Sequence, residues 1–386
     1  MADVTYPGVY IDELPAGVRR IDGVQTSTAA FVGPGGGGPC DQPVHVHALA
    51  DFERAFGAVS ETDPMRLAVE LFFANGGMDA VVVRAGGEVG SEPPAVRGLH
   101  ALDGVERCDL VCLPGLYADI PPTELTTLAA VLGAASRYCA RKGAILLIDP
   151  LPDWQSVDDV VSGPSSIGAI TTSVEGENAV AFFPDLHVAT RDGPVTCAPA
   201  GAIAGVIART DRTRGLWKAP AGVEATIAGT VGVASAINPK GASALADVGV
   251  NTIRRFPGTG IVPWGARLLA GATRGDPEWR YVNIRRLMIY LEHSIDDGLR
   301  WVVFEPNEEP LWASIRRSVE CFLTSLFRQG AFAGRTPDEA YFAKCGPDTM
   351  TQDEIDNGVL NVVVGFAPLR PAEFVTFRIQ HRATDD

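Results

Sequence analysis

Histidine and cysteine pairs are the first places in this sequence where metal chemistry could arise. His45 and His47 flank Val46, so an extended strand would point both imidazoles to one side, as half of a metal site. A structural zinc site normally takes four protein ligands, and no cluster of matching spacing completes this pair. Cys108 and Cys112 stand four residues apart with no second pair nearby. We therefore expect solvent-facing histidines, cysteines that pack as small apolar side chains, and neither a metal nor a cofactor.

Asp149 is the strongest candidate for acid–base or ligand chemistry. It follows an apolar run that is typical of a buried strand, and α/β proteins bind ligands at the carboxyl ends of parallel strands. Pro150 makes a turn-starting role equally compatible with the sequence. No Gly-x-Ser-x-Gly motif occurs in the sequence. We keep one alternative function. It is an α/β hydrolase or ligand-binding enzyme centred on residues 80–210 that uses Asp149 and a distant histidine.

Two further motifs resemble catalytic or phosphate-binding sites without meeting their requirements. Glu305 with Glu308 or Glu309 could form a carboxylate pair, but the last two precede a predicted helix, whose dipole favours acids at its start. The glycine-rich segment 33–39 lacks the Lys-Ser or Lys-Thr that follows a phosphate-binding loop. We predict no catalytic, metal-binding or cofactor-binding residue from these motifs.

Two arginine pairs, Arg285 with Arg286 and Arg316 with Arg317, lie on predicted amphipathic helices. Most charged helix faces are solvated, and Arg316 is spaced to pair with Glu320 one turn later. A face that binds an acidic partner is the functional alternative. The spacing alone leaves both interpretations open.

The composition is that of an acidic globular protein. The chain has 386 residues, of which 46% are hydrophobic and 20% charged, and 32 Lys and Arg against 47 Asp and Glu give a net charge of −15. This acidic excess disfavours direct nucleic-acid binding. The sequence has seven scattered cysteines and starts without a secretory signal, which indicates a reducing cytoplasm. It has no apolar run of ~20 residues, so we expect no membrane insertion.

Strands alternating with helices predict a parallel α/β body over roughly 80–210. Beyond it, residues 211–265 are rich in Gly and Ala and are expected to be irregular. Two amphipathic helices follow, the first ending near Gly298 and the second ending at Gly330, with a strand at 301–304 between them. Strand-like runs lie at 80–84, 109–113, 144–150, 179–183 and 359–366, and body helices at 64–75, 125–142 and 200–209.

Both ends of the chain are predicted to be extended. Residues 1–33 show no helical period, and in segment 374–380 apolar and polar residues alternate. A terminal strand on a flexible joint can add to the edge of a neighbour's sheet instead of pairing within its own subunit.

Several motifs distributed along nearly the whole chain are specific enough to compare with a known family. The N-terminal ones are Tyr6-Pro7-Gly8-Val9-Tyr10-Ile11 and residues 21–33. The more specific ones lie in the second half, at 256–261 (FPGTGI), 264–267 (WGAR), 279–287 (WRYVNIRRL), 301–307 (WVVFEPN) and 370–375 (RPAEFV). Together these motifs resemble those of contractile phage tail sheath proteins.

The resemblance implies a structural protein and no enzyme activity. Subunits of this family stack as hexameric rings around an inner tube, and the resulting sleeve contracts to drive the tube through a target envelope. The expected partners are further copies of the chain, an inner tube protein, and baseplate and tail-terminator or cap proteins. The chain would be assembled in the bacterial cytoplasm as part of a phage tail or a phage tail-like injection particle.

The resemblance also implies a fold class and its domains. It gives a parallel-sheet α/β body of subtilisin-like fold, an α+β C-terminal sheath domain and extended terminal strands. The expected domains are an N-terminal arm at 1–33, the α/β sheath domain at 34–260, the C-terminal domain at 261–369 and a terminal strand at 370–386.

Two groups of site residues follow from the family's assembly. A C-terminal helix faces the tube in such sheaths, so Arg316, Arg317 and Glu320 become candidate tube-facing residues. The terminal arms join sheets of neighbouring subunits, so the candidate inter-subunit residues are Tyr6, Pro7, Gly8, Val9, Tyr10, Ile11, Phe374, Val375, Phe377 and Ile379.

Overall fold

The computed structural model describes residues 19–86, 93–116, 124–272 and 279–373. The chain forms two compact units. The body comprises residues 25–290 and 369–386, and the second unit comprises residues 1–24 and 291–368. Helix α10 (Val282–Leu299) begins in the body and ends in the second unit.

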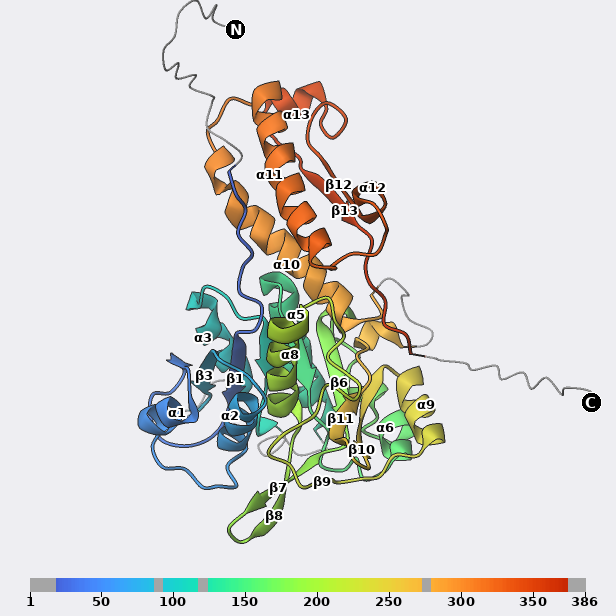
Figure 1. The fold of residues 1–386 in the computed structure, drawn as a ribbon. Coiled ribbons are helices and arrows are strands. Elements are labelled where there is room, and N and C mark those ends of the chain that lie inside the picture. Colours follow the sequence, from blue (N-terminus) through green and yellow to red (C-terminus); the bar gives the residue numbers. More distant parts are fainter. Residues whose placement is uncertain (1–18, 87–92, 117–123, 273–278, 374–386) are drawn as a thin grey trace, which may run out of the picture. The chain divides into compact units, whose positions relative to one another are not determined.

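The body is built on an eight-stranded sheet with the strand order β11-β10-β6-β5-β4-β1-β3-β2 (Figure 1). The inner pairs are parallel, whereas β2 and β11 pair antiparallel at the two edges. The central strands are almost wholly buried, as expected for a parallel sheet with covered faces. The strands are β1 (Ala29–Gly33), β2 (Pro43–Val46), β3 (Ala80–Arg84), β4 (Leu110–Cys112), β5 (Ile145–Ile148), β6 (Ala179–Phe183), β10 (Val250–Phe256) and β11 (Gly260–Trp264).

Helices cover both faces of this sheet. The body also contains a small three-stranded sheet. Alternate residues of each strand enter separate cores, so Phe31 packs with α2 and α8 whereas Val32 packs with α3 and α5. The helices are α1 (Leu49–Phe56), α2 (Pro64–Ala74), α3 (Pro94–Ala101), α5 (Leu125–Lys142), α6 (Val157–Ser162), α7 (Ile167–Ile170), α8 (Ala200–Arg214) and α9 (Pro239–Asp247). The small sheet consists of β7 (Leu186–Thr190), β8 (Gly193–Cys197) and β9 (Gly232–Val233).

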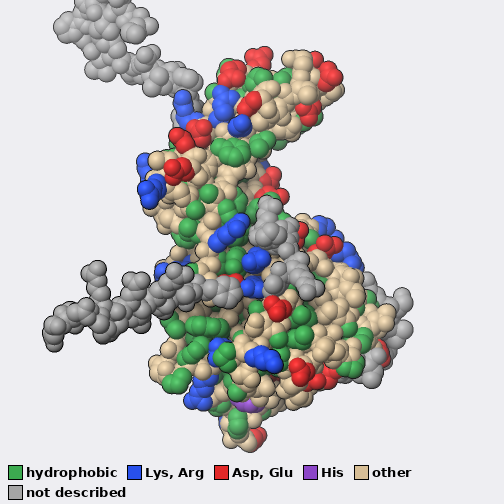
Figure 2. Space-filling model, turned by 90° about the vertical axis from the view of Figure 1, so that its right-hand side faces the viewer, with side chains coloured by type: hydrophobic (Ala, Val, Ile, Leu, Met, Phe, Trp, Pro, Cys, Tyr) green, Lys and Arg blue, Asp and Glu red, His purple; other side chains and the backbone are tan. Residues whose placement is uncertain are grey.

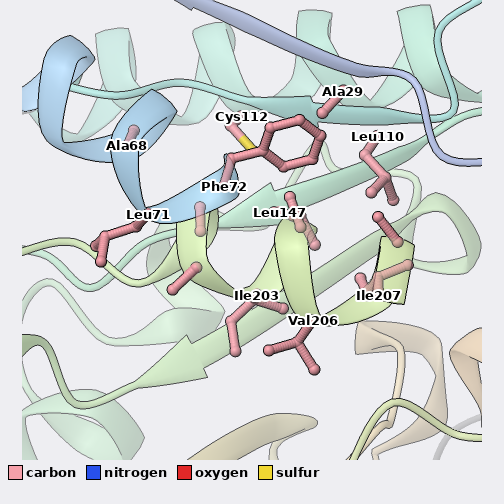
Figure 3. Close-up of a cluster of buried hydrophobic side chains, with 14 of the residues drawn as sticks. Ala29, Ala68, Leu71, Phe72, Leu110, Cys112, Leu147, Ile203, Val206 and Ile207 are labelled. Carbon is pink, nitrogen blue, oxygen red and sulfur yellow. The ribbon is translucent and has the colours of Figure 1, made fainter. Parts of the chain in front are cut away.

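The core between the sheet, α2 and α8 is apolar and tightly packed (Figure 3). Phe72 of α2 is fully buried beside sheet residues Cys112 and Leu147, and its ring meets that of Phe31 edge to face at 5.5 Å. Gly201 and Gly205 of α8 allow this packing. A Cβ at Gly201 would lie 2.2 Å from the carbonyl oxygen of Ala68, and one at Gly205 would lie 2.4 Å from that of Phe72. The two helices therefore meet backbone to backbone.

We expect Gly205→Ala to lower the free energy of unfolding by roughly 1–3 kcal/mol, because the helices must separate to admit the methyl group. Gly168→Ala in α7 is the matched control. A Cβ at Gly168 would have no neighbour within 4 Å, so this change is expected to be neutral or stabilising by about 0.4–1 kcal/mol. Chemical denaturation of both variants measures the difference, and equal stabilities would contradict the close helix contact.

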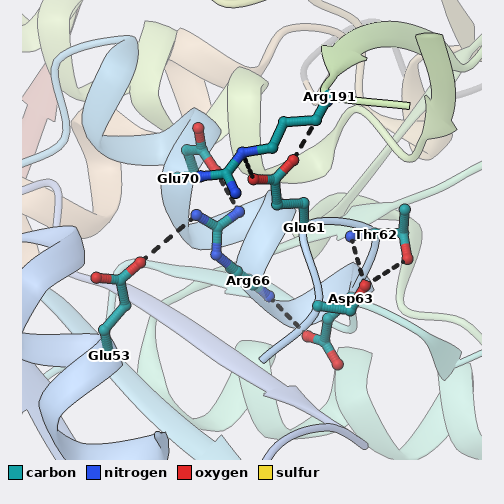
Figure 4. A network of polar contacts seen from close by, with 8 residues as sticks. Glu53, Glu61, Thr62, Asp63, Arg66, Glu70 and Arg191 are labelled. Carbon is teal, nitrogen blue, oxygen red and sulfur yellow. Dashed lines mark hydrogen bonds and ion pairs between the residues drawn. The ribbon is translucent and has the colours of Figure 1, made fainter. Parts of the chain in front are cut away.

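A polar network on the body surface holds the start of α2 (Figure 4). The carboxylate of Asp63 accepts a hydrogen bond from the amide of Arg66 at 2.9 Å and caps the helix. The Arg66 guanidinium pairs with Glu70 one turn later at 2.9 Å. Arg191, in the turn between β7 and β8, pairs with Glu61 at 2.9 Å. Surface ion pairs of this kind contribute little stability each.

The second unit packs a two-stranded sheet against a long helix. Strands β12 (Tyr341–Lys344) and β13 (Val363–Phe366) pair antiparallel, and the Tyr341 hydroxyl lies 2.6 Å from that of Thr324 on the helix. Two short helices complete the unit, α12 (Pro337–Ala340) and α13 (Gln352–Asp356). The long helix is α11 (Glu309–Arg328), and its buried face comprises Leu311, Trp312, Ile315, Ser318, Val319, Phe322, Leu323 and Leu326.

Most of the elements predicted from the sequence are confirmed. The strand predicted at 179–183 has the bounds of β6, and the helix predicted to stop before Gly143 ends at Lys142, with Gly143 in the left-handed region at φ 66°. The second amphipathic helix is also confirmed, because Gly330 follows α11 with φ 82°. These elements carry unambiguous periodicity and end signals.

Two predictions of secondary structure are wrong. The expected strand at 301–304 is a 3-10 turn at Arg300–Val302, followed by exposed Val303 and Phe304. In the described part of the chain, no strand pairs with this apolar run. The second half of the segment expected to be irregular, 211–265, is regular. Asn238 accepts from the amide of Gly241 and starts α9, and Gly258, at φ 79°, closes the turn between β10 and β11.

The first strand of the structure lies inside the segment that the sequence predicts to be an extended arm. Residues 29–33 fall within the arm predicted at 1–33, yet they form β1 in the interior of the sheet, because Ala29–Val32 is an uninterrupted apolar run flanked by β3 and β4. The other expected bounds, 34–260, 261–369 and 370–386, stay predictions.

Candidate assembly interface

The histidine pair lies at the surface and the cysteine pair lies in the core. His45 and His47 are exposed on both sides of buried Val46, and Nδ1 of His47 is 3.4 Å from a carboxylate oxygen of Asp79. Cys108 and Cys112 are buried. Solvent-facing histidines and core cysteines are therefore confirmed. Across the described ranges, no group of three or more His, Cys, Asp or Glu side chains is placed to hold a metal ion.

Asp149 joins the sheet to α8. It is buried at the end of β5 and accepts a hydrogen bond at 2.8 Å from the amide of Ala200, the first residue of α8. The first amides of a helix have no partner within the helix, so a carboxylate is well placed there. Burial nevertheless raises the pKa of Asp149 to about 8. We assign the residue to the architecture of the body.

The start of α11 explains the acidic residues that precede it. Glu308 lies at the N-cap position and Glu309 in the first turn, as the dipole argument predicts. Glu309 pairs at 2.6 Å with Arg316, whose guanidinium also donates to the carbonyl of Cys345. The predicted pairing of Arg316 with Glu320 is wrong, because Arg316 points back along the helix toward Glu309.

The outer face of α11 is where two of the candidate tube-facing residues lie. Arg317 and Glu320 are exposed, whereas Arg316 is partly buried by its contacts within the subunit. Basic and acidic side chains are interspersed on the molecular face shown in Figure 2. Of the three candidate tube-facing residues, Arg317 and Glu320 are therefore the accessible ones, with Arg316 held beside them.

Arg286 is buried, whereas its helix pattern predicts either a solvated face or a face that binds an acidic partner. Its side chain is 5% exposed, and its guanidinium binds both carboxylate oxygens of Asp211 in α8 at 2.6 and 2.8 Å. Arg285 donates to Asn178 at 2.9 Å and lies over the ring of Trp279. The expectation of a solvated or partner-facing pair is wrong for Arg286, because a bidentate carboxylate compensates its burial.

The segment that leads into the N-terminal strand is anchored to this buried pair. Arg286 donates to the carbonyl of Thr26, and the hydroxyls of Thr26 and Ser27 donate to Asp211 at 3.0 and 2.9 Å. The next residue, Thr28, donates its amide to the buried carboxyl of Asp109 at 2.9 Å. We call residues 26–28 the N-terminal root.

The segment that follows the second unit is anchored to the body in a similar way. Glu373 binds Arg267 through both carboxylate oxygens, at 2.6 and 2.9 Å. Burial would raise the pKa of Glu373, but the Arg267 guanidinium holds it below its ordinary value. Asn283 of α10 donates to the carbonyls of Leu369 and Trp217 at 3.2 and 2.9 Å. We call residues 369–373 the C-terminal root.

The β12–β13 sheet exposes one of its faces. Tyr341 packs toward α11, whereas Phe342 is 49% exposed with its ring over Gly365 of the opposite strand, and Val363 is 44% exposed. Among the described residues, no third strand pairs with this sheet. The expected arm residues lie outside the described ranges: Tyr6, Pro7, Gly8, Val9, Tyr10, Ile11, Phe374, Val375, Phe377 and Ile379.

Sequence comparison connects the chain with tail sheath proteins. Residues 275–382 match a family model described as the phage tail sheath C-terminal domain. The tail sheath protein of Vibrio phage KVP40 is 26% identical over 187 residues, which make up 48% of this chain. The match spans 26% of the phage protein's own length.

Comparison with solved structures extends the likeness to almost every residue. A subunit in the contracted helical sheath of the anti-feeding prophage is 29% identical with a TM-score of 0.78, and the match covers 98% of this chain and 99% of that one. This chain is a homologue of contractile tail sheath proteins. The sheath homologue also matches a subunit of the contracted sheath of an extracellular contractile injection system, PVC, with 26% identity, a TM-score of 0.75 and 98% of each chain covered.

The matching proteins are structural components of sheaths, so the enzyme alternative for residues 80–210 is not supported. None of the helices in the described part of the sheath homologue is long and apolar enough to span a membrane. The body is a mixed α/β unit with a mainly parallel sheet, as predicted.

Sequence reasoning missed the residues that anchor the two roots. Arg267, Asn283 and Arg286 lie within motifs that carry the family resemblance, but the resemblance assigned them no role. A local signal was present in α10, where a polar side chain, Asn283, directly follows the apolar Val282 and precedes Ile284, both buried. A polar residue in such a setting requires partners, although the sequence does not identify them.

Proposed function

We propose that the sheath homologue polymerises as stacked hexameric rings around an inner tube and contracts to drive that tube through a target envelope. The proposal is carried by the likeness of 98% of the chain to a subunit of a contracted helical sheath. Matches to chains in baseplate structures of the anti-feeding prophage support a baseplate partner. The remaining partners are further copies of this chain, an inner tube protein and a tail-terminator or cap protein.

Strand exchange between subunits is part of this proposal. A two-stranded sheet is marginally stable alone, and its free edges offer unpaired backbone groups to another chain. The β12–β13 sheet has this form within the described residues, with Phe342 and Val363 exposed. Strands from the arms of neighbouring copies, carrying residues 6–11 and 374–379, would add to it by main-chain hydrogen bonding.

The tube-facing surface in this proposal is the outer face of α11. Arg317 and Glu320 present one charge of each sign there, and Arg316 lies at the margin of the same face. Exposed charges of this kind set the register and the rate of association more than its strength. The particle would be a phage tail or a phage tail-like injection system assembled in the bacterial cytoplasm, and the subtilisin-like topology of the body stays a prediction.

Electron microscopy of the chain co-expressed with its tube and baseplate proteins tests the function. The parent chain is expected to form striated hollow sleeves, and dispersed particles only would contradict the proposal. Deleting residues 374–386 is expected to leave a folded subunit that no longer sediments as polymer. Deleting only 382–386, beyond Ile379, is the matched control and should preserve the sleeves. Sleeves of full length from both deletions would rule out the C-terminal arm as an interlocking strand.

A further inference from the structure

Within the second unit, residues 19–24 lie against the C-terminal half of α10. Ile21 is 4% exposed because it packs where Gly298 leaves room, and a Cβ at Gly298 would lie 2.7 Å from a side-chain carbon of Ile21. The amide of Val24 donates to the hydroxyl of buried Ser294 at 3.2 Å. These pairs bind the chain along the helix in the antiparallel sense, with lower residue numbers facing higher ones.

The N-terminal end of this segment is also bound, through Arg19. The guanidinium of Arg19 lies 4.3 Å above the ring of Trp301, just beyond the last residue of α10. A guanidinium over an indole face is the most favourable cation–π arrangement. Residues 19–24, which we call the strap, are therefore fixed by an apolar contact, a hydrogen bond and a cation–π contact.

Within the body, the first turns of α10 bind both roots. Arg286 holds the N-terminal root through the carbonyl of Thr26, and Asn283, three residues earlier on the same helix, holds the C-terminal root through the carbonyl of Leu369. Arg267 adds a bidentate ion pair to Glu373 at the end of the described C-terminal root. A single helix thus holds the chain on the inner side of each terminal arm.

We propose that α10, together with Arg267, tethers both arms, and that Ile21 and Glu373 are positioning residues that fix the points from which the arms leave the subunit. The inference rests on the proposed function, because it assigns the tether a use in the polymer. A root that is already ordered in the free subunit spares the polymer the entropy of ordering it when the arm docks. It also transmits a pull on either arm directly into a helix.

Two measurements on three variants test the tether. Ile21→Ser removes the apolar anchor of the strap, Ile21→Val is the conservative rescue, and Val303→Ser makes a comparable change at a side chain of the same unit that is 63% exposed. Hydrogen exchange of the soluble subunit is expected to show the Val24 amide exchanging about tenfold faster in Ile21→Ser. Exchange in β4 and β5 should be unchanged. Sedimentation is expected to show several-fold less polymer from Ile21→Ser, with Ile21→Val and Val303→Ser close to the parent.

The C-terminal root is tested by Glu373→Gln, which removes the charge of the ion pair while keeping the shape. Glu305→Gln, at an exposed turn residue, is its control. Glu373→Gln is expected to lower polymer yield several-fold without changing exchange in the sheet.

The outcomes separate the tether from the proposed function. Unchanged exchange at Val24 in Ile21→Ser would show that these contacts do not hold the strap and would overturn the inference. Faster exchange with full polymer yield would overturn it too, because the strap would then be structural only. Failure of the parent chain to form sleeves would contradict the proposed function instead, and that result is seen in the parent alone.

Discussion

The free energy of unfolding attributable to Asp149 is expected to fall as the pH rises from 3.8, the ordinary pKa of an Asp side chain, to about 8, its pKa in the folded protein. Between these values the folded state keeps a proton that the unfolded chain releases, so stability declines with increasing pH. The stabilising effect of the bound proton is complete below the lower value and lost above the higher one. Burial likewise raises the pKa of Asp109 and of Asp185 to about 7, which adds to the same trend.

Asp149→Asn isolates the largest of these effects. The asparagine oxygen can still accept the hydrogen bond from Ala200, but the side chain does not ionise. A pKa of about 8 instead of 3.8 corresponds to roughly 5–6 kcal/mol between the protonated and ionised limits. The variant is therefore expected to be more stable than the parent above pH 8, by up to that amount, and of similar stability near pH 4.

Urea denaturation at a series of pH values measures this difference. Carboxylates stabilised by partners, such as Glu373, titrate in the opposite sense at low pH, so the comparison of variant with parent is the informative quantity. Asp192→Asn, at an exposed position in the turn between β7 and β8, is the matched control and should follow the parent. Parallel stability curves for Asp149→Asn and the parent would show that Asp149 is ionised in the folded state.

Arg286→Met is expected to lower the free energy of unfolding of the body by roughly 3–5 kcal/mol, because it leaves a buried carboxylate without its cation. Asp211 is 6% exposed and would keep, among the described residues, the hydroxyls of Thr26 and Ser27 as side-chain partners. The carbonyl of Thr26 would also lose the guanidinium donor. Thermal or chemical denaturation followed by circular dichroism measures the loss.

The double variant Arg286→Met/Asp211→Leu distinguishes the ion pair from simple packing. Replacing both charges with apolar side chains removes the uncompensated carboxylate, so we expect it to recover much of the stability lost in the single variant. Arg317→Met, at an exposed position on α11, is the control and should stay within about 0.5 kcal/mol of the parent. A double variant no more stable than Arg286→Met would indicate that the guanidinium acts mainly through packing.

The parts of the fold that follow from sequence are those in which local pattern and tertiary structure agree. β3 and β6 are apolar runs bounded by turn residues, and α11 carries a continuous apolar face ended by Gly330. The strand predicted at 301–304 does not form, because a β-branched run becomes a strand only where another strand pairs with it. The prediction of irregular structure is wrong for the second half of 211–265, because glycine and proline also end helices and strands.

The candidate site could be predicted only in outline. The charge of Arg317 and Glu320 and their place on α11 follow from the helix period, but the pairing of Arg316 with Glu309 depends on how that side chain turns back along the helix. The buried ion pair of Arg286 could not be predicted, because its partner Asp211 is 75 residues away in sequence. Long-range polar contacts of this kind leave no periodic signal.

The β12–β13 sheet, which has two strands in the described part of the chain, also has a consequence for the subunit before it is incorporated. An exposed pair of strands with Phe342 and Val363 on its surface offers the same template to any extended chain, including a misfolded copy. Because the proposed docking uses main-chain hydrogen bonds, it discriminates poorly between a correct strand and an incorrect one. A cell that makes this protein in excess of its tube and baseplate is therefore expected to accumulate insoluble aggregates, and balanced synthesis of the components would protect its solubility.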